Sequence, residues 1–312
     1  MIKRQQQGTV LKSTGNHYNI RSADGLLYSC VIKGNYRMKG VKSTNPVAVG
    51  DHVLFEIEEG QQQGMILDVL DRRNYIIRKS TNLSKQSHII AANIDTAMLV
   101  ISLRHPETPI EFIDRYLVTA EAYKIPAIVV INKTDLYRDE EKQLMKGINV
   151  LYTTIGYECI ETSVTDKVNL DIVRERLKDK VTLISGISGV GKSSLINALE
   201  PKMDLRTDEI SDYHKAGKHT TTFAEMLELS GGGYVIDTPG IRGFGVVDMN
   251  KNELYHFFPE IFRISDKCKF YNCTHIHEPG CYVRDAVEKG YVSASRYGSY
   301  LSLYHDDNEK YR

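Results

Sequence analysis

The first 73 positions of the chain alternate between short apolar stretches and turn residues. Five of these stretches are predicted strands, at 8–12, 17–21, 26–32, 46–57 and 65–70. Glycine, asparagine and aspartate mark the intervening turns, as in residues 13–16 and 23–25. Five short strands in so few residues predict a small closed barrel of the OB type, and an SH3-like barrel would give much the same pattern.

The pattern changes from about residue 90 onward, where longer apolar runs alternate with helical stretches. Fully buried strands are predicted at 96–102, 127–131, 150–154 and 181–185, and one more strand at 233–237. Helices are predicted at 110–123, 142–147 and 170–177. Apolar strands that alternate with helices favour a mostly parallel sheet with helices on both faces.

Beyond residue 246 the strands stop and helices are expected instead. Asn252 is a candidate N-cap for a helix with apolar side chains on one side, namely Leu254, Phe257, Phe258 and Ile261. A last helix carries a stripe at i, i+3, i+4 and i+7 that we expect to serve packing rather than binding: Tyr297, Tyr300, Leu301 and Tyr304. The patterning divides the chain into a barrel domain at 1–73, an α/β domain at 74–245 and a helical domain at 246–312.

The formal net charge is zero, with 40 basic and 40 acidic residues, so bulk charge suggests no partner. The distribution is uneven, because residues 1–43 hold eight Lys or Arg and one acid: Lys3, Arg4, Lys12, Arg21, Lys33, Arg37, Lys39, Lys42 and Asp24. A second basic run contains no acid: Arg72, Arg73, Arg78, Lys79 and Lys85. Such clusters suggest a polyanion such as RNA, although an ordinary solvated surface explains them equally well.

No targeting or membrane segment is apparent. The N-terminus lacks the apolar core of a signal peptide, and the longest apolar runs, such as 128–131, are too short to span a bilayer. Three of the five cysteines fall near the C-terminus, and no framework of paired cysteines runs through the chain. We therefore expect a cytoplasmic protein with no membrane partner.

A phosphate-binding sequence follows the predicted strand 181–185. It fits G-x-x-x-x-G-K-[ST] and consists of Gly186, Ile187, Ser188, Gly189, Val190, Gly191, Lys192 and Ser193, followed by Ser194. Its glycines let backbone N–H groups converge on phosphate oxygens, and the next helix adds the positive end of its dipole. Lys192 is expected to reach the β- and γ-phosphates of a nucleotide, and the Ser193 hydroxyl to bind Mg²⁺.

A second motif lies at the end of the buried strand 127–131, where doubly wound sheets bind ligands: Asn132, Lys133, Thr134 and Asp135. An ionised carboxylate only accepts hydrogen bonds, so Asp135 can take both N1–H and the exocyclic amino group of guanine, an edge that adenine lacks. Asn132 would contact the opposite edge of the base and brace the neighbouring loop, and Lys133 would lie along the base plane. Together with the phosphate loop, this motif favours GTP over ATP.

Two further segments are expected around the phosphates. Asp237 ends a predicted strand and would hold Mg²⁺ through water, while the N–H of Gly240 can contact the γ-phosphate. The first switch should lie in residues 217–222, where Thr221 is the preferred residue to complete the Mg²⁺ shell. The expected Mg²⁺ ligands are therefore Ser193, Thr221 and, through water, Asp237.

Thr162 and Ser163 follow another strand and are in place for a loop behind the guanine, although a plain strand-end turn explains them nearly as well. Ordinary GTPases begin with the phosphate loop and end with the guanine-binding loops. Here the order along the chain is Asn132, Ser163, Gly186, Thr221 and Asp237. This is the same cyclic order begun at another point, which predicts a circular permutation.

With this order the chain resembles the RsgA (YjeQ/YloQ) family of circularly permuted GTPases. The resemblance covers nearly the whole chain and rests on NKTD at 132–135, GISGVGKSSLINAL at 186–199, GKHTTT at 217–222, DTPGIRGFG at 237–245 and the late cysteines. It implies an N-terminal OB domain, a permuted GTPase domain and a C-terminal zinc domain. It also implies GTP hydrolysis that the small ribosomal subunit stimulates late in the maturation of that subunit.

Ile241 occupies the position where Ras-like proteins place the glutamine that orients the attacking water. The nearest candidate to replace it is His219, and the resemblance implies this role, although an exposed loop histidine without function would look the same. We expect docking on the subunit to order His219 over the γ-phosphate. Because the chain leaves the GTPase domain after its second switch, we expect nucleotide state to reach the zinc domain there, with Gly243 and Gly245 as hinges.

Three thiols and an imidazole lie within fourteen residues near the C-terminus: Cys268, Cys273, His275 and Cys281. Cys₃His is a closed tetrahedral set typical of structural zinc, and three local cysteines cannot form two disulfides. His277 is a rival ligand, and the resemblance to the family selects His275. We expect one structural Zn²⁺, on which so short and apolar-poor a domain depends to fold.

The motifs predict a GTPase that uses Mg²⁺ and hydrolyses GTP to GDP and phosphate. With the resemblance, we expect a monomer that binds the small (30S) subunit and its rRNA and uses hydrolysis to time its release. Its candidate catalytic residues are Lys192, His219 and Thr221. The main alternative is an RNA-binding scaffold or regulator that binds GTP without a required hydrolysis step. A metabolic P-loop enzyme is a third possibility, against which the motif at 132–135 argues.

Overall fold

The computed structural model describes residues 3–32, 46–58, 61, 63–79, 87–203, 225–237 and 250–305. They fall into two compact units. The first unit comprises the described residues up to 98, together with 171–185, 192–203 and 225–237, and the second comprises 99–170, 186–191 and 250–305. Within these residues, no helix has both the length and the apolar character needed to cross a membrane.

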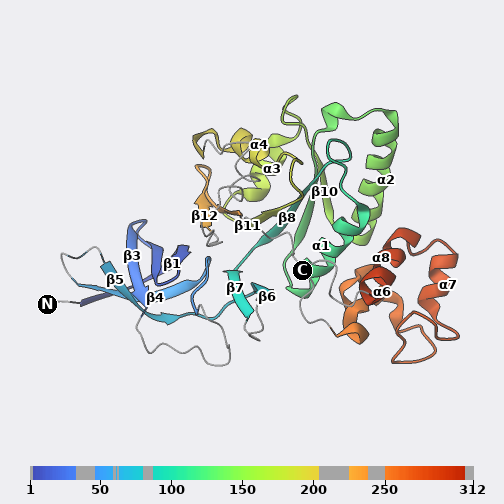
Figure 1. The fold of residues 1–312 in the computed structure, drawn as a ribbon, viewed down its shortest axis with the longest axis horizontal. Helices are drawn as coiled ribbons and strands as arrows, with labels where there is room; N and C mark the ends of the chain where they lie inside the picture. The colour runs from blue at the N-terminus through green and yellow to red at the C-terminus, as the bar shows by residue number, and fades with distance from the viewer. Residues whose placement is uncertain are drawn as a thin grey trace, which may run out of the picture. The chain divides into compact units, whose positions relative to one another are not determined.

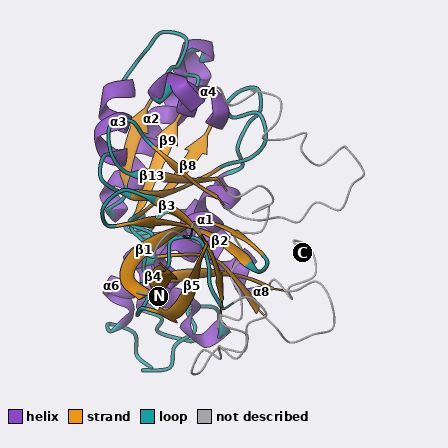
Figure 2. Ribbon diagram, turned by 90° about the vertical axis from the view of Figure 1, so that its left-hand side faces the viewer, coloured by secondary structure: helices purple, strands orange, loops and turns teal. Residues whose placement is uncertain are grey.

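Five strands of the first unit form a barrel (Figures 1 and 2): β1 (Lys3–Thr14), β2 (His17–Ser22), β3 (Leu27–Ile32), β4 (His52–Glu58) and β5 (Gln63–Val69). β1 pairs antiparallel with β2 and β4, β3 pairs in parallel with β5, and β4 pairs with β5, so the ladder closes. The interior is apolar and includes Val10, Tyr18, Ile20, Phe55 and Ile66. The order β1-β2-β3-β5-β4 is that of an OB-fold, which confirms the OB-type barrel over the SH3-like alternative.

Two arginines of the second basic run form ion pairs within the first unit. Arg72 contacts both carboxylate oxygens of Asp51 at 2.6 Å, and both side chains are almost fully buried. Arg73 contacts Asp95 at 2.8 Å. Asp51 would keep a buried charge without its cation, so Arg72 stays paired with it and is not available to bind a polyanion.

The other elements of the first unit include β6 (Tyr75–Lys79) and β7 (Ser87–Ala92), an antiparallel pair that the sequence analysis did not predict. β11 (Val181–Ser185) pairs in parallel with β13 (Tyr234–Asp237), which pairs antiparallel with β12 (Glu225–Glu228). The helices are α3 (Leu170–Leu177), α4 (Lys192–Leu199) and the 3₁₀ turn η2 (Pro201–Met203).

The barrel strand β1 meets β12 in the same unit. Lys12 lies opposite Glu225 in this antiparallel pairing, and its ammonium contacts the Glu225 carboxylate at 2.8 Å. Arg21 of β2 forms an ion pair with Glu228 of β12. Two cations of the basic N-terminal segment therefore neutralise acids of the chain itself, which weakens the charge argument for a polyanion partner.

β8 (Thr96–Ile101), with all six residues buried, continues from the first unit into the second. In the second unit β9 (Ala127–Ile131) neighbours β8 and pairs in parallel with β10 (Glu158–Glu161). Helix α1 (Ile110–Ala122), the 3₁₀ turn η1 (Thr134–Leu136) and helix α2 (Asp139–Ile155) lie between the strands along the chain. The expected alternation of buried parallel strands and helices is confirmed here.

The predicted strand at 150–154 is wrong, because these residues belong to α2. The helix predicted at 142–147 is confirmed, but it extends over Asp139–Ile155. Its buried residues Met145, Ile148, Tyr152 and Ile155 continue a helical spacing through the β-prone sequence Val-Leu-Tyr-Thr-Thr. The N–H of Arg138 donates to the Glu141 carboxylate at 2.8 Å at the start of the helix. Packing of one continuous face outweighs local strand propensity here.

The C-terminal helical region comprises η3 (Lys251–Phe257), α6 (Pro259–Ser265), α7 (Tyr282–Glu288) and α8 (Ala294–His305), coloured orange to red in Figure 1. Asn250, and not Asn252, is the N-cap of η3, because its Oδ1 accepts the N–H of Asn252 at 3.1 Å. Tyr300 is fully buried, and Tyr297 and Tyr304 pack against the same core. The tyrosine stripe therefore serves packing, as expected.

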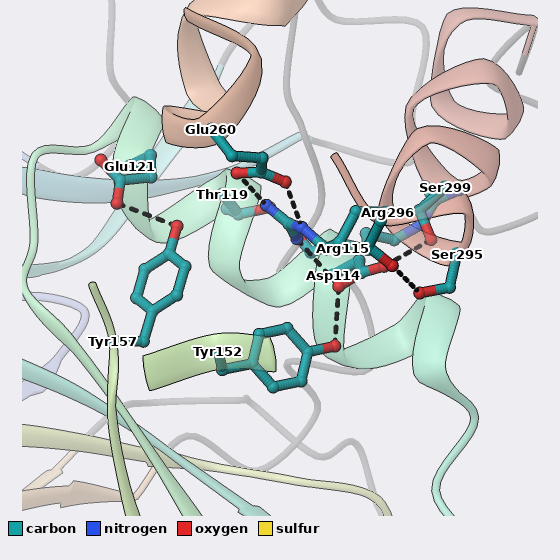
Figure 3. A network of polar contacts seen from close by, with 11 residues as sticks. Asp114, Arg115, Thr119, Glu121, Tyr152, Tyr157, Glu260, Ser295, Arg296 and Ser299 are labelled. Atoms are coloured by element: carbon teal, nitrogen blue, oxygen red, sulfur yellow. Dashed lines mark hydrogen bonds and ion pairs between the residues drawn. The ribbon is translucent and has the colours of Figure 1, made fainter. Parts of the chain in front are cut away.

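A buried ionic cluster fixes these helices to α1 (Figure 3). Arg296 of α8 has no exposed surface; its guanidinium donates to Asp114 of α1 at 2.8 Å and to Glu260 of α6 at 2.6 Å. Asp114 also accepts hydrogen bonds from the hydroxyls of Tyr152 at 2.7 Å and Ser299 at 2.6 Å. Each charge has partners, and the two acids raise the pKa of Arg296 against the opposing effect of burial.

We expect Arg296→Leu to lower the free energy of unfolding by about 3–5 kcal/mol, because Asp114 would keep a buried charge without its cation. Chemical denaturation monitored by circular dichroism would measure the change. Lys289→Gln is the matched control: it removes an exposed ion pair with Asp285 and should cost less than about 0.5 kcal/mol. Equal effects of the two substitutions would contradict the assignment.

Candidate nucleotide site and metal centre

The segment 132–135 follows β9 and is fastened to the phosphate loop by two side chains of the second unit. The buried Asn132 amide donates to the carbonyl of Val190 at 2.9 Å. The Lys133 ammonium donates to the carbonyl of Gly189 at 2.6 Å. Burial lowers the pKa of Lys133, an effect that the nearby Asp135 carboxylate opposes. Two motifs far apart in the sequence are thus joined directly.

Thr162 and Ser163 lie directly behind this segment. The Thr162 hydroxyl donates to the Asn132 side-chain oxygen at 3.1 Å, and its carbonyl accepts the N–H of Thr134 at 3.1 Å. The Ser163 hydroxyl donates to one oxygen of the exposed Asp135 carboxylate at 2.7 Å. The short loop therefore contacts both side chains that are expected to bind a base, and its own role at the base stays a prediction.

Two glycines of the phosphate loop are required by close backbone contacts. Gly186 has a φ of 149°, and a Cβ there would come within 2.2 Å of the carbonyl oxygen of Val100. Gly191 has a φ of 92°, and a Cβ there would come within 2.6 Å of the Asn132 amide nitrogen. The glycines thus let the loop turn tightly and leave room for the side chain that reaches it.

The loop continues covalently into the first unit, where Lys192 and Ser193 begin α4 and Ser194 follows. Ser193 is buried. Asp237 is the last residue of β13 and lies opposite Ile184 of the parallel strand β11. The backbone of Asp237 is therefore at the carboxyl edge of the strands, where α/β sheets bind ligands.

Several expected site residues lie outside the described part of the chain: His219, Thr221 and Gly240. The same holds for Ile241 and for the expected hinges Gly243 and Gly245. Their expected roles in water positioning, magnesium binding and transmission of nucleotide state accordingly stay predictions.

The four expected metal ligands come together, with their donor atoms all within 4.8 Å of one another: Cys268, Cys273, His275 and Cys281. The Sγ atoms of Cys268 and Cys281 each lie 3.5 Å from Nδ1 of His275 and 4.0 Å from each other. Tetrahedral bonds of about 2.3 Å to sulfur and 2.0 Å to nitrogen would place such ligands about 3.5–3.8 Å apart. The two sulfur–nitrogen distances match this geometry, and the set as a whole is compact enough to hold a four-coordinate metal ion. Exposed His277 does not belong to it, which decides between the two histidines.

The surroundings of the cluster suit a metal. Burial raises the pKa of the Cys273 and Cys281 thiols and lowers that of His275, so thiolates there require a nearby cation. Glu278 fixes the ligand loop by accepting hydrogen bonds from the Thr274 N–H at 2.7 Å and the Ile276 N–H at 3.1 Å. Burial would raise the pKa of Glu278, but hydrogen bonds from the Thr274 side chain and these N–H groups hold it at about 2.

Sequence reasoning did not identify Glu278 or Tyr137. The hydroxyl of buried Tyr137 donates to the carbonyl of Asn132 at 2.5 Å and accepts the N–H of Leu103 at 2.9 Å. Burial raises its pKa, so the hydroxyl stays protonated and able to donate. Both contacts of Tyr137 and most of those of Glu278 are to backbone groups, which no side-chain pattern in the sequence reports.

An OB barrel, a P-loop α/β domain and a base-binding loop that precedes the phosphate loop in the chain define a circularly permuted GTPase. Two family models match, the RsgA N-terminal domain over residues 7–66 and the RsgA GTPase over residues 69–247. The chain belongs to the RsgA family of GTPases.

Relatives of similar length match over nearly the whole chain. Proteins named small ribosomal subunit biogenesis GTPase RsgA from Phocaeicola vulgatus and Bacteroides fragilis are each 53% identical over 98% of this chain and 99% of their own length. The crystal structure of YjeQ from Thermotoga maritima matches with a TM-score of 0.80 and 32% identity, covering 96% of this chain and 98% of that one. The circularly permuted GTPase YloQ matches with a TM-score of 0.76 and 30% identity, over 96% of this chain and 94% of its own.

We expect the purified protein to hold about one divalent metal ion per chain at the cysteine cluster. Cys281→Ser should reduce the metal content to nearly zero, because it removes one of the four ligands. Cys159→Ser is the matched control, since Cys159 is a half-buried thiol on β10 outside the cluster. Elemental analysis of both variants is the measurement, and full metal content in Cys281→Ser would contradict the assignment.

Proposed function

We propose that this GTPase acts in late maturation of the small (30S) ribosomal subunit, binds that subunit and its rRNA, and hydrolyses GTP to GDP and phosphate to time its release. The observation that carries the proposal is the fastening of Asn132 and Lys133 to the phosphate loop, which builds a guanine-nucleotide site in permuted order. The relatives named above, which match the chain from end to end, support the choice of partner.

The nucleotide would bind with its base between Asp135 and the residues Thr162 and Ser163. One Asp135 oxygen is held by Ser163, which leaves acceptor capacity for N1–H and the amino group of guanine. The phosphates would lie in the loop 186–194, where Lys192 balances their charge. Asn132 and Thr134 would hold the base loop in place.

Mg²⁺ would be bound by Ser193 and Thr221 and, through water, by Asp237, with the Gly240 N–H on the γ-phosphate. His219 would position the attacking water, since Ile241 cannot. The metal at the cysteine cluster would be Zn²⁺ in a structural role, because three thiolates and one imidazole leave no open coordination position.

We propose domain boundaries at 1–73 for the OB domain, 74–245 for the GTPase domain and 246–312 for the zinc domain, in a monomeric cytoplasmic protein. The boundaries of the first two domains lie close to those of the two matching family models. The OB barrel would contribute rRNA contacts, because such barrels bind oligonucleotides on their faces and loops. Basic residues of this domain other than Arg72, Lys12 and Arg21, which pair with acids of the chain, would supply charge for this contact.

The partner is tested by co-sedimentation with purified small and large subunits in the presence of GDP or a non-hydrolysable GTP analogue. We expect the protein to sediment with small subunits, more strongly by about tenfold with the analogue than with GDP, because release follows hydrolysis. Equal binding to both subunits in both nucleotide states would contradict the proposed role in maturation of the small subunit.

His219→Ala should lower GTP turnover in the presence of small subunits by about a hundredfold, because the attacking water would lose its positioning group. The affinity for GTP should stay unchanged. Single-turnover phosphate release with and without subunits measures both the loss and the stimulation. Full stimulated turnover in the variant would remove His219 from this role, and a wild-type rate that subunits do not change would favour the scaffold alternative.

A further inference from the structure

Tyr137 lies two residues beyond Asp135 in the sequence. Its buried side chain reaches back to the backbone of the base-binding segment 132–135. Its hydroxyl stands between two backbone groups: it donates to the carbonyl of Asn132 at 2.5 Å and accepts the N–H of Leu103 at 2.9 Å. Leu103 belongs to the segment 102–108 that connects β8 to α1. One hydroxyl therefore ties the base-binding segment to a second loop.

The loop 102–108 is itself closed by hydrogen bonds. The Ser102 N–H donates to the Thr108 hydroxyl at 3.2 Å, and the Thr108 N–H donates to the Ser102 carbonyl at 2.8 Å. These two hydrogen bonds join the ends of the loop, so the bond from the Leu103 N–H to the Tyr137 hydroxyl connects Asn132 to a segment that is itself held by hydrogen bonds.

The same loop also reaches the phosphate loop. The His105 carbonyl accepts the Lys133 ammonium, which donates at the same time to the Gly189 carbonyl. Pro106 lies against Gly189, where a Cβ on the glycine would come within 3.2 Å of the proline ring. Lys133 thus connects the base-binding segment to both the phosphate loop and loop 102–108. Tyr137 forms a second link between the base-binding segment and loop 102–108.

We propose that the Tyr137 hydroxyl is a positioning group for guanine recognition: by bridging Asn132 and Leu103 it holds the base-binding segment in register with loop 102–108. This inference rests on the proposed guanine-nucleotide site at Asn132 and Asp135. Tyr137 touches the backbone rather than the base, so it acts through these residues.

The effect of the hydroxyl is separable from that of the ring. Phenylalanine would fill the same space but would leave the Leu103 N–H and the Asn132 carbonyl without this partner in a buried place. A shift of the Asn132 backbone would displace an amide that must meet both Val190 and Thr162. Contacts to the base should weaken more than contacts to the phosphates.

The test measures the binding of GDP, IDP and ADP to the wild-type protein and to Tyr137→Phe by titration calorimetry. Hypoxanthine, the base of IDP, lacks the exocyclic amino group from which Asp135 would accept a hydrogen bond. The ratio of the GDP affinity to the IDP affinity therefore reports how well that carboxylate is placed. We expect Tyr137→Phe to bind GDP about tenfold more weakly and to lose most of the preference of the wild-type protein for GDP over IDP.

Tyr152→Phe is the matched control. It removes another buried tyrosine hydroxyl, which donates to Asp114 and not to the base-binding segment. Both variants should melt at lower temperature, but Tyr152→Phe should keep the GDP affinity and the preference for GDP over IDP.

Thr108→Val gives a second approach with Tyr137 intact, because it loosens the loop 102–108 by removing the acceptor of the Ser102 N–H. Thr108→Val should also weaken GDP binding, by a smaller factor than Tyr137→Phe does.

Unchanged GDP affinity and base preference in Tyr137→Phe would overturn this inference while leaving the proposed function intact. Equal losses in Tyr137→Phe and Tyr152→Phe would show that the hydroxyl affects stability alone, which also overturns it. A wild-type protein that binds ADP as tightly as GDP would defeat the proposed function, and this inference with it.

Discussion

The hydrogen bond from the Asn132 amide to the Val190 carbonyl is the contact on which the nucleotide site depends. It joins a loop that could recognise a base to a loop that could hold phosphates, and Gly191 is needed because a side chain there would displace this amide. Thr162 holds the other end of the same amide. The three segments are therefore positioned by one side chain with both of its polar atoms satisfied.

This dependence explains why the chain can be permuted without loss of the site. β9 and β10 pair in parallel in the second unit, and β11 and β13 do so in the first, so each pair presents its carboxyl ends at one edge. A parallel ladder fixes where loops emerge and does not require them to follow a particular order along the chain. The starting point of the chain can therefore move to an exposed loop while the same side chains still meet.

The C-terminal helices pack around an apolar core, and two further groups of polar contacts fix their positions. Arg296 joins α8 to α1 and α6 through fully partnered buried charges, and the cysteine cluster closes the segment between α6 and α7. Both need all of their partners, because a buried charge or thiolate destabilises the fold once its partner is removed. The GTPase core and the metal-binding region thus share helix α1 as a common support.

The sequence by itself determined a small N-terminal barrel, the parallel α/β domain, the permuted order of motifs and the three clustered cysteines, because fixed spacings and apolar periodicity are local properties. It did not determine the end of α2, where packing of Tyr152 and Ile155 outweighed strand propensity, nor the pairing of Arg72 with Asp51. The choice of His275 over His277, which spacing alone left open, is decided by which imidazole faces the thiols. Only the tertiary structure could place Tyr137 between Asn132 and Leu103, since both of its partners are backbone groups whose positions follow from the sheet and not from any residue type.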